Sequence, residues 1–256
     1  MWLKFLAWLT LIQLLNGAPN KELGRIYAGK TVPVRDYPFL VALRRGRKFI
    51  CGGTLISPTC VLTAAHCLEN RDQVQDLYVH AQQQCVEDVS PLPHVRQAWF
   101  SLVSPQYGMR GYDSDIAILK LYQPFDIAGK ASTIQVDFNE LPEQANLTII
   151  GWGQIGQGCN WNQCLQGANV TMMKQQECVQ RLGVLGPFTS NMFCALGQNC
   201  SDACLGDSGG PVLYAGRTAG IVSWGVGCGS GYPGAYTRLS SLSMTMFVKS
   251  MMLKHC

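Results

Sequence analysis

The sequence predicts an all-β fold in which short strands form sandwiches or barrels. Short apolar runs bounded by Gly, Pro or charged residues recur along the chain, and no helical period separates them. With 47% hydrophobic and 14% charged residues, the composition indicates a substantial core and excludes a disordered chain. The expected strands cover residues 38–43, 53–56, 61–63, 115–121, 147–150, 168–171, 211–213 and 219–224.

Other segments are distinguished by composition. Only residues 242–253 have the pattern of a helix, and no strong linker divides the chain, so residues 124–143 are the expected crossover between two halves. The formal net charge of +4 is too small and too dispersed to indicate nucleic-acid binding.

Residues 1–18 have the pattern of a cleaved secretory signal peptide. Lys4 precedes an apolar run over residues 5–15, and the small residues at 16–18 offer a cleavage site. This run is shorter than the roughly 20 residues that a membrane span needs. Twelve cysteines also indicate an oxidising compartment, where disulfides persist. We therefore predict a secreted product with no membrane span, which is consistent with storage in secretory granules.

Residues 19–25 form a short polar stretch that ends in Arg25. One interpretation is a flexible N-terminal tail. The other is a propeptide cut after Arg25, which would release Ile26 with a new α-amino group.

The run 202–211 is the strongest candidate for a catalytic segment. Ser208 lies between Asp207 and two glycines, with another glycine at Gly206. Small neighbours would let a substrate carbonyl approach, and the N–H groups of Gly206 and Ser208 could then face its oxygen. Taken alone, the run fits three interpretations: a catalytic serine, a Gly-rich turn, or the G-x-S-x-G elbow of α/β-hydrolases.

A histidine and an aspartate decide between these interpretations. His66 lies in a compact apolar segment, where a lone histidine is more often a core residue than a base. Asp115 begins an apolar strand, and a carboxylate there needs a partner such as an imidazole N–H. The order His66, Asp115, Ser208 excludes the elbow, which requires its histidine after its serine; only His255 follows Ser208.

Six motifs then resemble, in order and spacing, the trypsin/chymotrypsin-type serine proteases, from Ile26 to the C-terminus. The resemblance implies two antiparallel six-stranded β-barrels, over about 26–130 and about 131–240, with the active site in the cleft between them and a short C-terminal helix over about 242–253. The motifs are Ile26-Tyr-Ala-Gly29, Leu62-Thr-Ala-Ala-His-Cys67, Asp115-Ile-Ala-Ile-Leu119, Gly151-Trp-Gly153, Gly206-Asp-Ser-Gly-Gly-Pro211 and Ser223-Trp-Gly225.

The resemblance also implies the role of each catalytic residue. Ser208 attacks the scissile carbonyl, His66 accepts and returns its proton, and Asp115 orients His66. The N–H groups of Gly206 and Ser208 hold the oxyanion, and the segment Ser223, Trp224 and Gly225 pairs with the substrate backbone. No cofactor is implied.

Substrate specificity is implied by residues around the pocket. Asp202 corresponds to the pocket floor and Gly225 and Gly234 to its walls, which favours Arg or Lys before the cut bond. Ala203 follows Asp202 in place of a serine and removes a hydroxyl that could help a lysine, so we predict that Arg is preferred. Tyr112 is expected to narrow the adjacent subsite and to favour small residues there.

The resemblance gives weight to cleavage after Arg25. The α-amino group of Ile26 would pair with Asp207, so the uncut zymogen should be nearly inactive. The alternative is a catalytically weak or inactive homologue that acts as an extracellular binding protein. It is favoured by Ala28, which stands where the family usually has glycine, and by six cysteines outside the family's bridges. The expected partners are protein or peptide substrates, an activating protease and serine protease inhibitors, and we expect a monomer.

By resemblance, three disulfides join Cys51 to Cys67, Cys178 to Cys194, and Cys204 to Cys228. For the rest, we expect Cys159 and Cys164 to pair with each other or with Cys200, and Cys60 with Cys256. A metal site is the alternative, which an oxidising compartment disfavours. The six remaining cysteines are Cys60, Cys85, Cys159, Cys164, Cys200 and Cys256.

Asn146 and Asn169 begin glycosylation sequons, and Asn199 begins a weaker one. The basic run Arg44–Lys48 is either an exosite for polyanions or the solvated tip of a hairpin.

Overall fold

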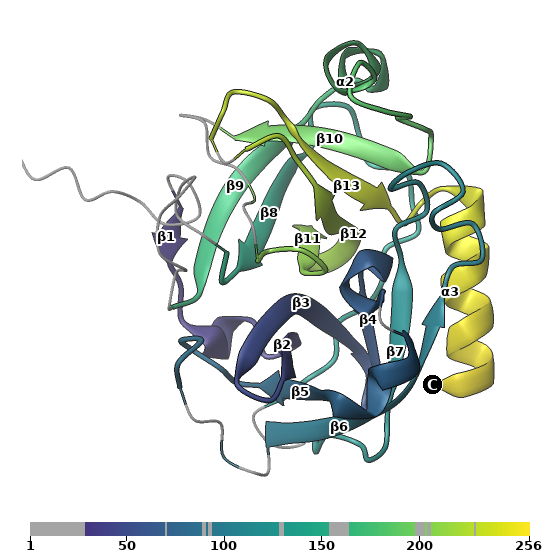
Figure 1. Cartoon of the computed structure of the whole chain (residues 1–256). Helices are drawn as coiled ribbons and strands as arrows, with labels where there is room; N and C mark the ends of the chain where they lie inside the picture. Colours follow the sequence, from purple (N-terminus) through teal and green to yellow (C-terminus); the bar gives the residue numbers. More distant parts are fainter. Residues whose placement is uncertain are drawn as a thin grey trace, which may run out of the picture.

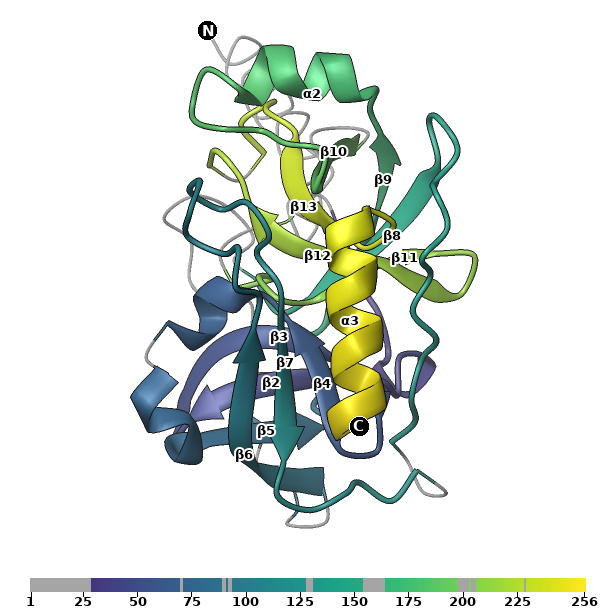
Figure 2. The same ribbon diagram turned by 90° about the vertical axis from the view of Figure 1, so that its right-hand side faces the viewer.

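The computed structural model describes residues 29–69, 71–88, 91, 94–127, 131–153, 164–197, 203, 206–227 and 229–256. Two β-barrels lie one above the other, and a C-terminal helix runs along one side of both (Figure 1, Figure 2). Among the described residues, no helix combines the length and the apolar character needed to cross a membrane.

The first barrel is closed in the order β2-β3-β4-β7-β6-β5, and all of its neighbouring strands are antiparallel. Its interior is filled by leucine, isoleucine and valine side chains that are almost inaccessible to water, such as Leu55 and Ile118. The strands are β2 (Leu40–Arg45), β3 (Lys48–Ser57), β4 (Cys60–Thr63), β5 (Leu77–Ala81), β6 (Val95–Val103) and β7 (Ala117–Leu121).

The second barrel is a ring of six antiparallel strands in the order β8-β9-β10-β13-β12-β11, which closes because β11 pairs with β8. A short strand, β1 (Lys30–Thr31), adds to the edge of β9. The strands are β8 (Asn146–Gly151), β9 (Gln166–Met172), β10 (Met192–Gly197), β11 (Pro211–Tyr214), β12 (Arg217–Trp224) and β13 (Gly234–Arg238).

The expected two-barrel fold with a C-terminal helix is confirmed, but the prediction of a single helix is wrong. Helix α3 (Leu242–His255) occupies the expected place, whereas α2 (Gln175–Leu182) was not predicted. Helix α2 has only two turns and buries only Cys178 and Leu182, so it lacks a long apolar stripe. The short 3₁₀ turns are η1 (Val34–Asp36), η2 (Ala65–Leu68) and η3 (Arg71–Asp76).

Helix α3 anchors the end of the chain on the first barrel, as Figure 2 shows. Met244 and Val248 are buried in the same apolar cluster as the strands of that barrel. Lys120 of β7 donates a hydrogen bond to the carbonyl of His255 at 2.6 Å. A disulfide from Cys60 to Cys256 fastens the helix covalently to β4.

The disulfides Cys51–Cys67, Cys178–Cys194 and Cys60–Cys256 agree with the predicted pairings. The prediction for Cys164 is wrong, because it pairs with Cys85, 79 residues earlier, and not with Cys159 or Cys200. The two residues are neighbours only because the barrels bring them together, and a short spacing to Cys159 could not reveal this. The positions Cys159, Cys200, Cys204 and Cys228 lie outside the described residues.

The basic run Arg44–Lys48 lies at the hairpin between β2 and β3. Arg44 points inward: it is 8% exposed and donates hydrogen bonds to the carbonyls of Val86 and Arg47 at 2.6 and 2.5 Å. A polyanion could therefore reach only the other cations of the run, such as the exposed Arg47 and Lys48.

A half-buried histidine near Arg44 makes the stability of the first barrel depend on pH. The pKa of His80 is lowered from 6.5 to about 4, first because burial disfavours the charged imidazolium and second because Arg44 repels it. The folded state thus excludes a proton that the unfolded chain binds, so stability is fully present above about pH 6.5 and is lost as pH falls toward the folded pKa. His80→Gln should flatten this part of the stability curve.

Urea unfolding across this pH range, for the wild type and His80→Gln, measures the effect. The difference between the two curves removes the contribution of carboxylates, which titrate in both proteins. Two curves that stay parallel down to the folded pKa would contradict the prediction.

Candidate active site

Asp115 lies two residues before β7, between the barrels, and its side chain is fully buried. Its Oδ1 accepts a hydrogen bond from the backbone N–H of His66 at 2.9 Å, and its Oδ2 lies 2.8 Å from His66 Nδ1. The Ser223 hydroxyl donates to the same Oδ2 at 2.5 Å. The carboxylate is therefore surrounded by donors, which compensates for its burial.

His66 lies in the turn η2, which follows β4 directly. Its side chain is 19% exposed. Because Nδ1 faces the Asp115 carboxylate, the proton belongs on Nδ1. This assignment leaves Nε2, which lies 3.7 Å from Cys67 Sγ, without a hydrogen and able to accept a proton. Burial and the carboxylate thus hold the ring in the tautomer that a general base requires.

The loop around Ser208 is held between the two barrels. The Gly52 N–H of β3 donates to the Ser208 carbonyl at 2.8 Å, and the Gly209 N–H donates to the Val222 carbonyl of β12 at 2.8 Å. Gly209 has φ +77°, and a Cβ there would lie 2.2 Å from Thr63 Oγ1. Only glycine fits this position. The tight contact of Gly209 with Thr63 places the neighbouring half-buried Ser208 beside the end of β4, the strand that precedes His66.

Asp207, immediately before Ser208, is 2% exposed. Its Oδ1 accepts the Gly153 N–H at 2.8 Å. A Cβ on Gly151 or Gly153 would lie 2.1 or 2.4 Å from an Asp207 carboxylate oxygen, so both positions require glycine. The motif Gly151-Trp-Gly153 therefore packs directly against the Asp207 carboxylate and holds it in place.

Four of the expected substrate-binding residues, Ser223, Trp224, Gly225 and Gly234, lie at the adjoining ends of β12 and β13. A Cβ built on Gly225 would lie 4.0 Å from the Gly234 Cα, so these two glycines face each other. Trp224 stacks on Tyr112, with ring centroids 6.3 Å apart and an angle of 25°. Tyr112 also contacts the edge of His66, at 5.8 Å between centroids.

Sequence reasoning missed Phe188, whose ring lies 6.3 Å from that of Trp224. Phe188 comes from the connection between α2 and β10, where no motif marks it. Together with Tyr112 and Trp224 it forms an aromatic wall beside His66.

Sequence reasoning also missed a polar clamp that holds this wall together. The buried Asp113 accepts hydrogen bonds from Thr189 Oγ1 at 2.5 Å and from Asn191 Nδ2 at 3.2 Å. It joins the loop that carries Tyr112 to the loop that carries Phe188, so residues from both barrels are fixed relative to each other. The clamp depends on residues about 76 positions apart, which a local pattern cannot reveal.

Several predicted site residues lie outside the described residues: Asp202, Cys204, Cys228, Arg25 and Ile26. Among the residues that are described, one group could place three metal-ligand atoms together, namely Cys51, His66 and Cys67. The two sulfurs of this group are bonded to each other, so they offer no thiolate to a metal.

Comparisons with known proteins agree with this geometry. The family model Trypsin matches residues 26–245. The chain is 34% identical to a trypsin from Phaedon cochleariae, covering 87% of this chain and 86% of that protein. It is 35% identical to trypsin II-P29 from Gallus gallus, covering 84% and 85%. Its structure is similar to that of neuropsin, a serine protease expressed in the limbic system of mouse brain, with a TM-score of 0.78, 29% identity, and coverage of 88% of this chain and 98% of that one.

Proposed function

Because this chain belongs to the trypsin family of serine proteases, we propose that it is secreted as a zymogen and cleaves peptide bonds after Arg in preference to Lys. The family assignment makes it a serine-type endopeptidase, with protein substrates and inhibitors as partners. The observation that best supports a catalytic role for these residues is the contact of His66 Nδ1 with the buried Asp115 at 2.8 Å.

The proposed mechanism assigns one step to each group. His66 Nε2 takes the proton of Ser208 as its oxygen attacks the scissile carbonyl, and the N–H groups of Gly206 and Ser208 stabilise the oxyanion. His66 then passes the proton to the leaving amine, which leaves an acyl-enzyme on Ser208. Water, activated by His66, attacks the ester and releases the acid product. Asp115 keeps the imidazole oriented and stabilises its charged form throughout.

One assay tests this function. The purified chain is cleaved after Arg25 and offered an arginyl amide substrate, with and without a covalent inhibitor directed at the reactive serine. We expect turnover that the inhibitor abolishes, and no turnover from a Ser208→Ala variant prepared in the same way. Absence of inhibitable turnover would instead favour an extracellular binding protein.

We propose that Asp202 sets the preference for Arg. A long cation would pair with this carboxylate at the end of a pocket whose walls, Gly225 and Gly234, carry no side chains. Breaking a buried ion pair costs roughly 3–5 kcal/mol, so Asp202→Ser should lower kcat/KM for arginyl peptides by about 10²–10⁴-fold. Turnover measured on a peptide library gives this preference directly. Equal turnover of arginyl and lysyl peptides by the wild type, or a preference for Phe, would contradict it.

The same library tests the subsite beside the pocket. The Tyr112 ring lies against both His66 and Trp224, which supports the proposal that it restricts the preceding substrate residue to small side chains. A library profile that favours bulky residues at this position would contradict that role.

Secretion and activation are proposed from the N-terminal pattern. Removal of residues 1–18 would leave a precursor that begins at Pro19, and an activating protease would then expose Ile26. N-terminal sequencing of material from the culture medium, before and after activation, should find these two ends in that order. Protein retained in the cell with Met1 in place would contradict secretion.

We also propose that the chain is a glycoprotein. Asn146 and Asn169 are exposed on the neighbouring strands β8 and β9. Each accepts a hydrogen bond from the threonine of the other sequon: Thr171 donates to Asn146 at 3.4 Å, and Thr148 donates to Asn169 at 3.1 Å. Two glycans would thus leave one face of the second barrel. Enzymatic deglycosylation should reduce the mass of the secreted protein, and Asn146→Gln with Asn169→Gln should remove that change.

A further inference from the structure

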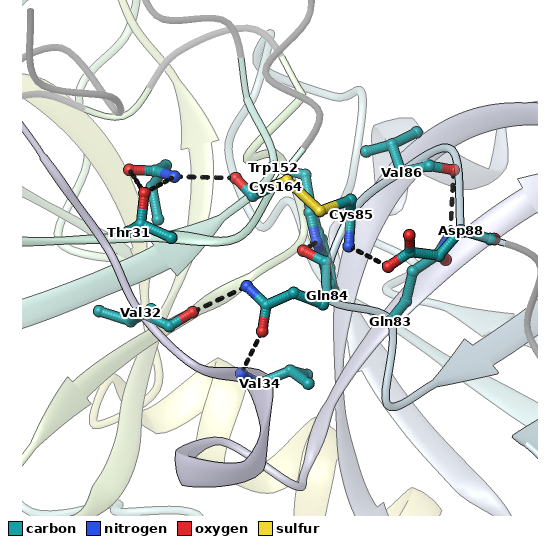
Figure 3. Close-up of a disulfide and its surroundings, with 11 residues drawn as sticks. Thr31, Val32, Val34, Gln83, Gln84, Cys85, Val86, Asp88, Trp152 and Cys164 are labelled. Carbon is teal, nitrogen blue, oxygen red and sulfur yellow. Dashed lines mark hydrogen bonds between the residues drawn. A yellow bond between two sulfur atoms is a disulfide. The ribbon is translucent and has the colours of Figure 1, made fainter.

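The Cys85–Cys164 disulfide connects the two barrels at a point where four chain segments meet (Figure 3). Cys85 follows β5 of the first barrel, and Cys164 lies two residues before β9 of the second. Of the four disulfides within the described part of the chain, this is the one that joins barrel to barrel. The other two segments that meet here are the N-terminal segment and the motif around Trp152.

Gln84, next to this bridge, contacts all of these segments. Its carbonyl accepts the Leu165 N–H at 2.7 Å and the Trp152 indole N–H at 3.3 Å. Its side chain binds the N-terminal segment twice: Oε1 accepts the Val34 N–H at 2.9 Å, and Nε2 donates to the Val32 carbonyl at 3.0 Å (Figure 3). One residue thereby fixes the relative positions of three segments.

A second residue extends the network to β1. Gln166 Nε2 donates to the Cys164 carbonyl and to Thr31 Oγ1, each at 3.0 Å. The Val32 N–H donates to the Leu165 carbonyl at 3.1 Å. Residues 31–34 are thus held on both sides, by β9 and by Gln84. These residues begin only five positions after Ile26.

Trp152 links these hydrogen bonds to the loop that contains Asp207 and Ser208. Its side chain is fully buried, and its ring packs against Phe49 with centroids 5.8 Å apart. The next residue, Gly153, donates its N–H to Asp207, which directly precedes Ser208. A shift of the Trp152 indole would therefore move the donor that holds Asp207.

We infer that Gln84 and the Cys85–Cys164 bridge are positioning residues for the reaction: they hold the Gly153 N–H against Asp207 and fix the segment through which the new N-terminus would reach that carboxylate. The inference depends on the proposed activation at Arg25. It means that a disulfide and a side-chain amide outside the triad affect turnover through the position of Asp207, without contact with the substrate.

The pH dependence of turnover distinguishes this role from simple stabilisation. An α-amino group ordinarily loses its proton at about pH 7.7–8.0. A carboxylate paired with the group keeps the amine charged to higher pH. Turnover of the cleaved enzyme should therefore fall on the alkaline side as this charge is lost. If the Asp207 carboxylate is held less firmly, its ion pair with the α-amino group is weaker. The alkaline loss of turnover should then occur at lower pH.

The experiment compares four cleaved, full-length proteins: wild type, Gln84→Ala, the double variant Cys85→Ser with Cys164→Ser, and the double variant Cys60→Ser with Cys256→Ser. The last is the matched control, because it removes a bridge that fastens α3 and touches none of the network. We expect the alkaline fall to move down by about one pH unit in the first two variants, roughly a tenfold loss of turnover on that limb. The control should unfold at a lower temperature than the wild type and keep the wild-type alkaline limb.

Two outcomes would overturn the inference, and they differ. If the wild type is active and all four proteins share one alkaline limb, the network only stabilises the fold and the proposed activation stands. If the wild type has no alkaline fall after cleavage, the proposed activation fails and the inference fails with it. Gln84→Ala retains every disulfide, so it reports on the network even if the Cys85/Cys164 variant does not fold.

Discussion

Replacing Asp115 with asparagine is expected to lower kcat by about 10⁴-fold while leaving the fold intact, as loss of the acid does in Ser-His-Asp triads. The reason lies in three donors that point at one carboxylate: the His66 N–H, His66 Nδ1 and the Ser223 hydroxyl. An asparagine can offer only one acceptor oxygen. If its NH₂ group takes the Oδ2 place, it donates to Nδ1 and forces the imidazole proton onto Nε2. That tautomer cannot accept the proton of Ser208.

The opposite orientation of the amide is no better. The NH₂ group would then face the backbone N–H of His66, so two donors would oppose each other at a buried position. The Asp115 carbonyl would still accept the Thr237 hydroxyl at 2.8 Å, so the strand itself should keep its place. The expected defect is therefore chemical, with kcat reduced and the thermal midpoint changed little.

Steady-state kinetics of the cleaved variant with an arginyl amide substrate measure the effect. Ser223→Ala is the matched control, because it removes one donor to Asp115 without changing the histidine tautomer. We expect a much smaller loss from it, about ten- to a hundredfold, the value of one hydrogen bond to a charged group. Wild-type turnover by Asp115→Asn would exclude the contact between His66 and Asp115 from catalysis.

The parts of the fold and site that could be predicted from the sequence are those with a local signature. The strand pattern is local, and so is the run around Ser208, whose glycines are required by positive φ at Gly206 and Gly209 and by close packing against Thr63. The chain order of His66, Asp115 and Ser208 excluded one hydrolase fold, and the described geometry of His66 and Asp115 agrees with the other.

What could not be predicted depends on contacts between the barrels. Cys85 and Cys164 are neighbours only in the folded protein, so the spacing of Cys159 and Cys164 suggested the wrong partner. Asp113 and Phe188 carry no motif, and their places beside Tyr112 and Trp224 follow from how the two barrels meet. Arg44 could be assigned to a hairpin but not to its inner face, because a run of cations does not tell which one is buried.

Arg25→Gln is expected to abolish the gain of activity on treatment with an Arg-specific activating protease, a difference that should exceed a thousandfold, on the order of the loss from removing oxyanion-hole donors. The reason lies in Asp207, a carboxylate that is 2% exposed and accepts the Gly153 N–H. A charge at such depth is stabilised best by an opposite charge, and a released α-amino group of Ile26 would supply one.

The position of Asp207 in the chain explains why this ion pair should control the rate of peptide hydrolysis. Asp207 adjoins Ser208, whose N–H is one of the two proposed oxyanion donors, and Gly210 donates its N–H to the Asp207 carbonyl at 3.0 Å. We expect a displacement of the Asp207 backbone away from Gly153 to misplace both donors, because they lie on the same stretch of chain. Without the new N-terminus, Ser208 and His66 would therefore be present but ineffective. The test uses Arg25→Lys as the matched control, which a protease that accepts Lys can still cleave, and N-terminal sequencing to confirm cleavage. Full turnover by uncleaved Arg25→Gln would show that the intact chain needs no activation.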